Sequence, residues 1–146
     1  HVVPEHFRVP AQALSEALNR TAGELRRLGK KVILVAPPPA LDFDIGLCVE
    51  RQRANLLILG RDGSCEIATP EYQAERRATL EFLSQVEAEG RVPVVRPDRF
   101  MCDEARCQVR EGTRGLYRDE GHFSIDGSRW FAGKSALADQ VKRLAR

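Results

Sequence analysis

The sequence predicts an α/β fold in which helices cover a parallel β-sheet, and the main reason is a pattern that occurs twice. An amphipathic helix ends at a glycine, a basic residue follows, and a short apolar run comes next. Within these runs, at residues 31–36 and 91–96, apolar residues follow one another without polar alternation. Such runs are typical of parallel strands that are buried on both faces. Two successive helix-to-strand units favour helices layered on such a sheet.

The N-terminal part of the chain predicts one helix and one strand. Residues 1–9 are expected to be irregular, and Pro10 suits the first turn of a helix that ends near Gly29. The strand at residues 31–36 is expected to stop at the prolines 37–39, because proline cannot continue a hydrogen-bonded ladder. The apolar stripe expected on the helix consists of Leu14, Leu18, Ala22, Leu25 and Leu28.

The middle of the chain is less clearly patterned. Residues 45–59 fit a helix, whereas residues 56–59 alone fit a strand, and the pattern leaves both interpretations open. A second helix is expected from Pro70 to Ala88, with Gly90 as its stop. The residues expected on its inner face are Ala78, Phe82, Leu83 and Val86.

The C-terminal part predicts a strand, a short hairpin edge and a helix. After the strand at residues 91–96, residues 108–112 are expected to form a short strand or the edge of a hairpin. A final helix is expected between Ser128 and Arg146. Its expected packing residues are Trp130, Phe131, Leu137, Val141 and Leu144.

Composition places the chain among ordinary globular proteins. The 146 residues are enough for one domain, and 42% hydrophobic with 30% charged residues excludes disordered and fibrous classes. The formal net charge is only +2, which does not indicate binding to a polyanion, so no nucleic-acid partner is expected. No apolar run is long enough to cross a bilayer, and nothing resembles a signal peptide. Because the chain opens with His1, we expect a processed product or an excised piece.

The cysteines indicate the cellular compartment. Their even number suggests two disulfides, most simply between the sequence neighbours Cys48 and Cys65 and between Cys102 and Cys107. A Cys48–Cys65 bridge would close a loop of about 18 residues and contribute about 3 kcal/mol. Disulfides would imply an oxidising compartment, which is the periplasm in a bacterium. Structural zinc prefers closer cysteine spacings, and free thiols in a cytosolic protein are the remaining alternative.

Asp119 and His122 are the best candidates for chemistry. His122 is expected on a loop between a strand and the last helix, where α/β folds commonly place catalytic groups. A tight turn brings a carboxylate three residues earlier under the imidazole, where it accepts a hydrogen bond from Nδ1–H. Nε2 is then free to take a proton from a hydroxyl nucleophile. Taken alone, an Asp-x-x-His pair also fits an ordinary loop hydrogen bond.

The residues around this pair carry a family resemblance. Residues 116–127 read Leu-Tyr-x-Asp-x-x-His-(apolar)-Ser-x-x-Gly. This pattern resembles the last block of the SGNH (GDSL-like) hydrolases, in the version found in the periplasmic domain fused to acyltransferase-3 membrane proteins. The resemblance implies that Asp119 is the orienting acid and His122 the general base of a Ser-His-Asp triad. Ser124 and Gly127 match the end of the motif and are expected to start the last helix.

The resemblance extends over about residues 20–135. The stretch at residues 28–39 looks like the penultimate helix-to-strand unit of that family. Two further features resemble the fused domain: Cys48 with Arg51, and the pair Cys102 and Cys107. The implied fold is a three-layer SGNH/flavodoxin-like sandwich with a parallel sheet, incomplete at its N-terminus. Residues 1–146 would form a single domain that is the C-terminal portion of this fold.

The chain departs from the family at the nucleophile. The family's Gly-Asp-Ser block and its oxyanion-hole blocks precede the region that this chain resembles, and no Gly-Asp-Ser triplet occurs here. Residues 56–65 imitate a strand followed by a Gly/Asp/Ser turn, but Arg61 and Gly63 break the spacing, so Ser64 is not expected to be the nucleophile. We therefore expect the catalytic serine upstream of this chain, and the fragment to be inactive alone.

The function implied is acyl transfer. An acetyl group would pass to a hydroxyl of a bacterial envelope polysaccharide, such as lipopolysaccharide O-antigen or peptidoglycan, or to water. The expected partners are this acceptor and an acyl donor delivered by a fused membrane domain, and the expected location is the periplasmic side of the inner membrane. One alternative is a non-catalytic polysaccharide-binding or scaffolding domain, and another is a cytosolic α/β protein with a structural Asp-x-x-His.

Other polar groups predict no further chemistry. Asp42 and Asp44 are expected to be turn residues, and a glycosidase carboxylate pair has no support beyond composition. Gly60 and Gly63 are not followed by the Gly-Lys-Ser/Thr of a phosphate loop. The glutamates of the helix at residues 70–88 are expected to form a solvated face with Arg76 and Arg77. No metal site and no cofactor are expected.

Overall fold

The computed structural model describes residues 10–58 and 64–145. A parallel pair of short strands lies at its centre, β1 (Leu34–Val35) and β3 (Val94–Val95), with Leu34 opposite Val94. The amide of Leu34 donates to the carbonyl of Pro93 at 2.9 Å, which places the pair in parallel register. The α/β class and the parallel orientation are therefore confirmed. The described residues contain this pair and two antiparallel pairs, not a complete three-layer sandwich.

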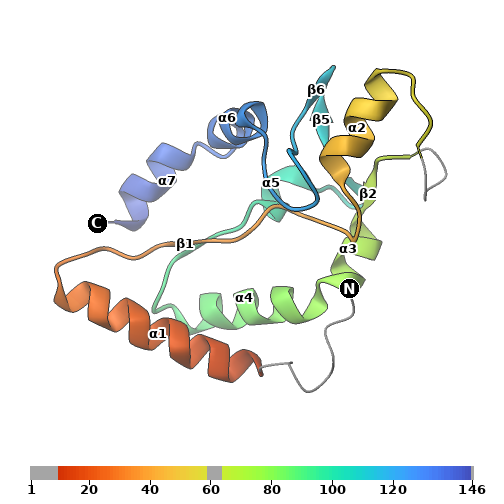
Figure 1. Ribbon diagram of the computed structural model, residues 1–146. Helices are drawn as coiled ribbons and strands as arrows, with labels where there is room; N and C mark the ends of the chain where they lie inside the picture. The colour runs from red at the N-terminus through yellow and green to blue at the C-terminus, as the bar shows by residue number, and fades with distance from the viewer. Residues whose placement is uncertain (1–9, 59–63, 146) are drawn as a thin grey trace.

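Two long helices cover one face of the parallel pair. α1 (Ala11–Arg27) and α4 (Arg77–Glu89) lie side by side below β1 in Figure 1. Ala22, Val86 and Val92 form the buried centre of this packing, and Leu34 and Val94 pack against it from the strands. Gly29 and Gly90 follow the two helices with positive φ angles of 73° and 64°, the left-handed conformation that glycine adopts readily. Both predicted glycine stops are confirmed.

The predicted stripe of α1 is wrong in part. Ala22 is buried, but Leu14, Leu25 and Leu28 are exposed, and Leu28 has a relative exposure of 72%. The helix instead buries Ser15, whose hydroxyl donates to Glu89 of α4 at 2.8 Å. The difference arises because α4 is the main packing partner of α1 among the described residues, so only a narrow strip of the α1 surface is covered.

The predicted strands are shorter and less buried than expected. Only two residues of each apolar run pair as a strand, and Val35 has a relative exposure of 49%, so burial on both faces is wrong for β1. Figure 1 shows α6 (Ile125–Lys134) and α7 (Leu137–Leu144) on the side of β1 opposite to α1 and α4. No residue of α7 is buried, so this second layer is thin.

The single helix predicted from Pro70 is two helices. α3 (Thr69–Glu75) and α4 are separated at Arg76, whose φ of −100° and ψ of 15° leave the helical region. Leu83 and Val86 are buried as expected, but Ala78 is exposed. Ala78 lies in the first turn of α4, next to the break, and the described residues leave it uncovered there.

The last helix is also divided and begins earlier than expected. Ser124 caps α6 by accepting a hydrogen bond from the amide of Gly127 at 2.9 Å, as the family resemblance implied. The chain then turns at Ala136, which has a φ of 47°, before α7. Phe131 is buried and stacks on Phe123, whereas Val141 and Leu144 are largely exposed.

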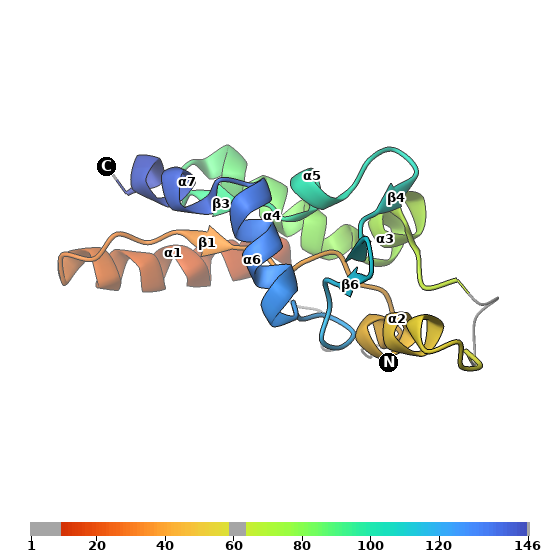
Figure 2. The ribbon, with the colours of Figure 1, turned by 90° about the horizontal axis from the view of Figure 1, so that it is seen from above.

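A second core lies beside the parallel pair. α2 (Ile45–Arg53), α3 and a group of short strands surround it, and Figure 2 shows these elements at one end of the molecule. The strands form two antiparallel pairs: β2 (Ile67–Ala68) with β4 (Arg106–Cys107), and β5 (Arg110–Glu111) with β6 (Arg114–Gly115). The hairpin edge predicted at residues 108–112 is thus confirmed.

α2 settles the open interpretation of residues 45–59 in favour of a helix, although a shorter one. The helix ends at Arg53, and Asn55 adopts a positive φ of 54°, which stops helical continuation. Residues 56–58 form no strand, and residue 59 lies outside the described part of the chain. The glycines at positions 60 and 63, and the predicted irregular segment 1–9, also lie outside it.

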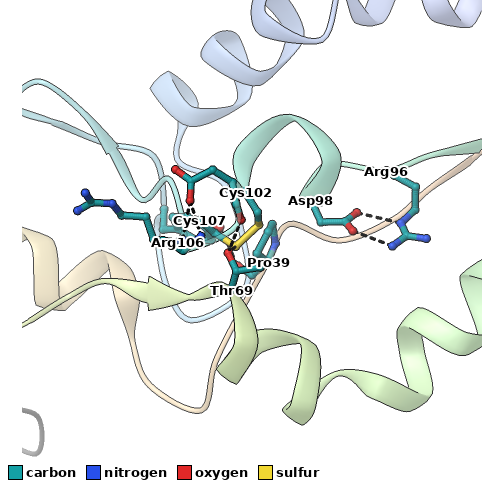
Figure 3. The surroundings of a disulfide bond; sticks show 10 residues. Pro39, Thr69, Arg96, Asp98, Cys102, Arg106 and Cys107 are labelled. Carbon is teal, nitrogen blue, oxygen red and sulfur yellow. Dashed lines mark hydrogen bonds and ion pairs between the residues drawn. A yellow bond between two sulfur atoms is a disulfide. The ribbon is translucent and has the colours of Figure 1, made fainter.

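Both predicted disulfides are present. Cys48 of α2 bonds to Cys65 with Cα atoms 5.6 Å apart, and Cys102 bonds to Cys107 with Cα atoms 3.8 Å apart. No free cysteine remains, so the thiol and zinc alternatives are excluded in this structure. Figure 3 shows the second bridge beside Thr69, whose hydroxyl donates to the carbonyl of Asp103 at 2.9 Å. α5 (Asp98–Met101) leads into this bridge from β3.

The same figure shows a buried ion pair that anchors the end of β3. Arg96 is almost fully buried and donates to both carboxylate oxygens of Asp98, at 2.9 and 2.7 Å. A third contact reaches Glu87 of α4 at 3.4 Å. Two carboxylates therefore balance the buried guanidinium and join α4 to α5. Among the residues described, no helix combines the length and apolar character needed to cross a bilayer.

Candidate active site

A tight loop between β6 and α6 carries the two candidate residues. Tyr117 and Phe123 form an antiparallel bridge that closes the loop, and the amide of Arg118 donates to the carbonyl of His122 at 2.9 Å. The hydroxyl of Tyr117 is buried and donates to the carbonyl of Pro39 at 2.7 Å. Burial raises the pKa of Tyr117 far above its usual value, so the hydroxyl stays a donor. The loop is thus attached to the segment that follows β1.

Two glycines let other elements approach this loop closely. A Cβ atom on Gly46, in the first turn of α2, would lie 2.4 Å from the carbonyl oxygen of Arg118. A Cβ atom on Gly127, in the first turn of α6, would lie 1.9 Å from the carbonyl oxygen of Leu116. Both distances are too short for any side chain, so α2 and α6 support the loop from two sides through backbone contact.

Asp119 accepts hydrogen bonds at both of its carboxylate oxygens. Oδ1 accepts from the amides of Gly121 and His122, at 3.1 and 2.9 Å, and lies 2.8 Å from Nδ1 of the His122 ring. Oδ2 accepts from Nε and Nη2 of Arg118, at 3.1 and 3.0 Å. The pKa of Asp119 is far below its usual value, first because of the Gly121 amide and then because of the bonds from His122 and Arg118. The carboxylate is therefore negatively charged throughout the neutral range.

His122 is oriented by this carboxylate and open to solvent on its other side. Its side chain has a relative exposure of 70%. With Nδ1 directed at Asp119, the nitrogen left for chemistry is Nε2, for which the described residues provide no partner. The predicted contact between the two side chains is confirmed as geometry, and this arrangement is the one that a general base requires.

A cavity of about 370 Å³ opens beside His122. Pro37, Pro38 and Leu41, from the segment after β1, supply apolar surface, and Arg76 stands at the break between α3 and α4. The remaining lining residues are Ala40, Asp42, Tyr72, Thr79, Leu83, Glu120 and Gly121. The end of a parallel strand, two helices and the histidine loop thus meet at one cavity, as ligand sites in α/β folds commonly do.

Sequence reasoning missed most of the cavity wall. The prolines were expected only to stop a strand, and Arg76 was expected on a solvated helix face. Arg76 is exposed, as expected, and it also donates through Nε to the carbonyl of Ala40 at 3.0 Å. A helix break at residue 76 would have been the only sequence signal for the place of Arg76 at the cavity. That break is not visible in the sequence, because helix-forming residues lie on both sides of it.

Ser64 is placed away from this cavity, whose lining residues do not include it. Its hydroxyl accepts a hydrogen bond from the amide of Glu66 at 3.2 Å, and its neighbour Cys65 is held in the bridge to Cys48. Asp44, which was expected to be a turn residue, is the N-cap of α2 and accepts from the amide of Leu47 at 2.8 Å. Within residues 10–58 and 64–145, no group of three or more histidine, cysteine or acidic residues is arranged to hold a metal ion.

Comparison with known proteins identifies the family of the chain. Neither the curated proteins nor the solved structures that were compared gave a match. A family model described as "SGNH domain (fused to AT3 domains)" matches residues 3–135, which is most of the chain and includes both candidate residues. The chain belongs to this family of SGNH domains.

Proposed function

We propose that the chain provides the acid–base half of a serine esterase or O-acyltransferase site, with His122 as general base and Asp119 as its orienting acid. One observation carries this proposal: Nδ1 of His122 lies 2.8 Å from a carboxylate whose pKa is far below its usual value, and the exposed His122 side chain lines a cavity. The family supports acyl transfer or ester hydrolysis as the class of reaction. A structural hydrogen bond alone would not require an exposed imidazole at a cavity.

The proposed nucleophile is a serine N-terminal to residue 1, and its segment also brings the oxyanion donors. Its Oγ attacks the carbonyl carbon of an acyl donor while Nε2 of His122 takes the hydroxyl proton. The same proton then passes to the leaving alcohol, and an acyl-enzyme remains. A sugar hydroxyl or water attacks this ester, gives its proton to Nε2, and the proton returns to the serine as the product leaves. Asp119 stabilises the imidazolium in both halves.

The proposed setting is the periplasmic side of a bacterial inner membrane. A fused AT3 membrane domain would deliver the acyl group, and the acceptor would be an envelope polysaccharide such as O-antigen or peptidoglycan. The two disulfides support an oxidising compartment. In the proposed complete domain, residues 1–146 form the C-terminal portion, and added strands extend β1 and β3 into a three-layer sandwich.

The test is hydrolysis of p-nitrophenyl acetate by this chain and by an N-terminally extended chain, each with and without His122→Ala. We expect activity only in the extended protein and its loss with His122→Ala. Ser128→Ala is the matched control, because Ser128 is exposed on α6 and does not line the cavity. Activity in the short chain would overturn the upstream nucleophile and return attention to Ser64. No activity in either form would leave a non-catalytic polysaccharide-binding domain.

A further inference from the structure

Different donors occupy the two oxygens of the Asp119 carboxylate. Oδ1 accepts from the amides of Gly121 and His122 and lies 2.8 Å from Nδ1 of the His122 ring. Oδ2 accepts from Nε and Nη2 of Arg118, at 3.1 and 3.0 Å. One carboxylate therefore lies between a guanidinium, which is always charged, and an imidazole, the side chain whose protonation ordinarily changes near neutral pH.

Arg118 itself does not line the cavity beside His122. It lines a second cavity, of about 470 Å³, together with residues of α2, β6 and α6, and the lining of this second cavity includes neither Asp119 nor His122. The Arg118 side chain has a relative exposure of 68%. A molecule bound beside His122 would therefore meet the ring and not the guanidinium. Arg118 would influence the chemistry through the carboxylate that it shares with the ring.

The charge of that carboxylate has two effects on a general base. It stabilises the imidazolium that forms during proton transfer, but it also favours the protonated ring before the reaction starts. A ring that is already protonated accepts no proton, and a base works best when its protonation changes near the operating pH. A guanidinium on the other carboxylate oxygen balances part of the negative charge and so moderates both effects.

We propose that Arg118 is a positioning residue that acts through Asp119: its guanidinium limits the basicity of His122, so that Nε2 is free to accept a proton at neutral pH. This inference rests on the proposed function, because it concerns the general base named there. The carboxylate stays beside the ring without Arg118, since the two backbone amides hold Oδ1. The task of Arg118 is thus to balance charge, and its guanidinium takes no part in proton transfer.

Other titratable and charged groups surround the loop. Those that line the cavity with His122 are Glu120, Asp42, Tyr72 and Arg76. Those that line the second cavity with Arg118 are Glu50, Arg53, Arg114 and Asp126. Tyr72 is uncharged at neutral pH, because burial raises its pKa to about 12. The cavity groups around His122 are the same in every variant below, so they do not account for a difference between variants.

The first test follows the titration of His122 and needs no catalysis. The ring C–H signal is recorded by NMR from about pH 4 to about pH 9 and is assigned by its loss in His122→Ala. Arg118→Gln removes the positive charge and leaves the carboxylate charge unbalanced, and both changes favour the imidazolium. We expect the titration midpoint of His122 to rise by about half a pH unit, because exposed charges interact weakly. Arg118→Lys keeps a positive charge and should raise it less.

Arg114→Gln is the matched control. Arg114 is exposed to a similar degree, 63%, and lines the same second cavity, but its guanidinium pairs with Glu111. This variant removes the same charge from the chain and should leave the His122 midpoint nearly unchanged. Equal midpoints in the wild type and in Arg118→Gln, or equal shifts in Arg118→Gln and Arg114→Gln, would overturn the proposal. A lower midpoint in Arg118→Gln would overturn it too, since the carboxylate would then have left the ring.

The pH dependence of p-nitrophenyl acetate hydrolysis by the N-terminally extended protein is the second test. We expect the low-pH limb of the rate profile to move to higher pH in Arg118→Gln, by the same amount as the NMR midpoint. If the midpoint moves but hydrolysis does not depend on His122, the acyl-transfer proposal fails while the link between Arg118 and His122 stands. If hydrolysis depends on His122 but the limb stays in place in Arg118→Gln, the role of Arg118 fails while the proposed function stands.

Discussion

At the scale of single residues, the candidate site depends on how one carboxylate is used. Asp119 accepts from two backbone amides, from Arg118 and from the His122 ring. The amide bonds shape the loop, and the ring contact selects the tautomer, so one side chain performs a structural and a chemical task. Sequence spacing predicted the ring contact. The roles of Arg118 and of the two amides depend on the turn itself, which the spacing does not define.

Replacing Asp119 by Asn should separate these two tasks. The amide oxygen of Asn can keep the loop bonds, but it carries no charge to stabilise an imidazolium and does not enforce the tautomer. In the N-terminally extended protein we expect ester hydrolysis to fall on the order of 10³–10⁴-fold. Asp126→Asn is the matched control on exposed α6, and it should change the rate little. A loss smaller than tenfold for Asp119→Asn would contradict the orienting role.

Gly46→Ala tests the support that α2 gives to the loop. The new Cβ atom would lie 2.4 Å from the Arg118 carbonyl oxygen, so the helix or the loop must move. We expect a loss of about 1–3 kcal/mol in the free energy of unfolding, measured with urea, as for other overpacked sites. Gly23→Ala is the control, because nothing lies within 4 Å of its Cβ position and an alanine suits the interior of α1. Equal stabilities of the two variants would show that the close approach is not maintained in solution.

The lowered pKa values predict how acid weakens the fold. Backbone amides of Arg106 and Ala105 lower the pKa of Asp103, and the amide of Gly121 with other donors lowers that of Asp119. A carboxyl group whose pKa is lower in the folded than in the unfolded state stabilises the folded state. This contribution is complete above the unfolded-state pKa of about 4, and it is lost as the pH falls through the folded-state pKa. Urea unfolding from about pH 6 to pH 2 should therefore show a smaller decline for Asp103→Asn than for the wild type. Parallel declines would mean that Asp103 keeps its ordinary pKa.

At the scale of elements, local patterns predicted what local forces decide. The start of α1 after Pro10 and the two glycine stops follow from backbone rules that act within a few residues, whereas the helix start at Ser124 was implied by the family resemblance. The break at Arg76 was not predicted by the same rules, because the neighbouring residues favour helix; at the break Arg76 contacts Ala40, which is 36 residues away. The exposure of Leu14 and Val35 could not be predicted either. An apolar residue type favours burial, but it does not show whether another element lies against that residue in the fold.

The two disulfides should differ in what they contribute to stability. Cys48–Cys65 joins α2 to the chain before β2 over a separation of 17 residues, whereas Cys102–Cys107 spans only 5. In the chain-entropy model the longer loop contributes about 3 kcal/mol and the shorter about 2 kcal/mol. We therefore expect the Cys48→Ala/Cys65→Ala variant to unfold at a lower urea concentration than the Cys102→Ala/Cys107→Ala variant. The reverse order would show that native contacts around the short bridge outweigh loop entropy.

At the scale of the whole molecule, the buried apolar residues form two clusters of unequal size. The parallel pair is covered by α1 and α4 on one face, while on the other α7 buries none of its residues (Figure 1). Val35, Val141 and Leu144 are exposed by 49%, 38% and 40%. The cavity and the histidine loop lie instead within the second, disulfide-linked core, where Leu41, Leu116 and Tyr117 are buried. The candidate site is thus built on the larger of the two buried clusters.

This difference predicts losses of stability of unequal size for apolar substitutions on α7 and at Phe131 of α6. Val141→Gln with Leu144→Gln should lower the free energy of unfolding only modestly, by about 1 kcal/mol per site, because the two residues are already 38% and 40% exposed and lose only part of a full burial. The pair should also reduce binding of a fluorescent hydrophobic dye, since it removes exposed apolar surface. Phe131→Ala should instead cost about 3–5 kcal/mol, because Phe131 is buried and stacks on Phe123 beside the histidine loop. A large loss of stability from the α7 pair, at a protein concentration where the chain is monomeric, would mean that α7 packs more closely on the parallel strands in solution.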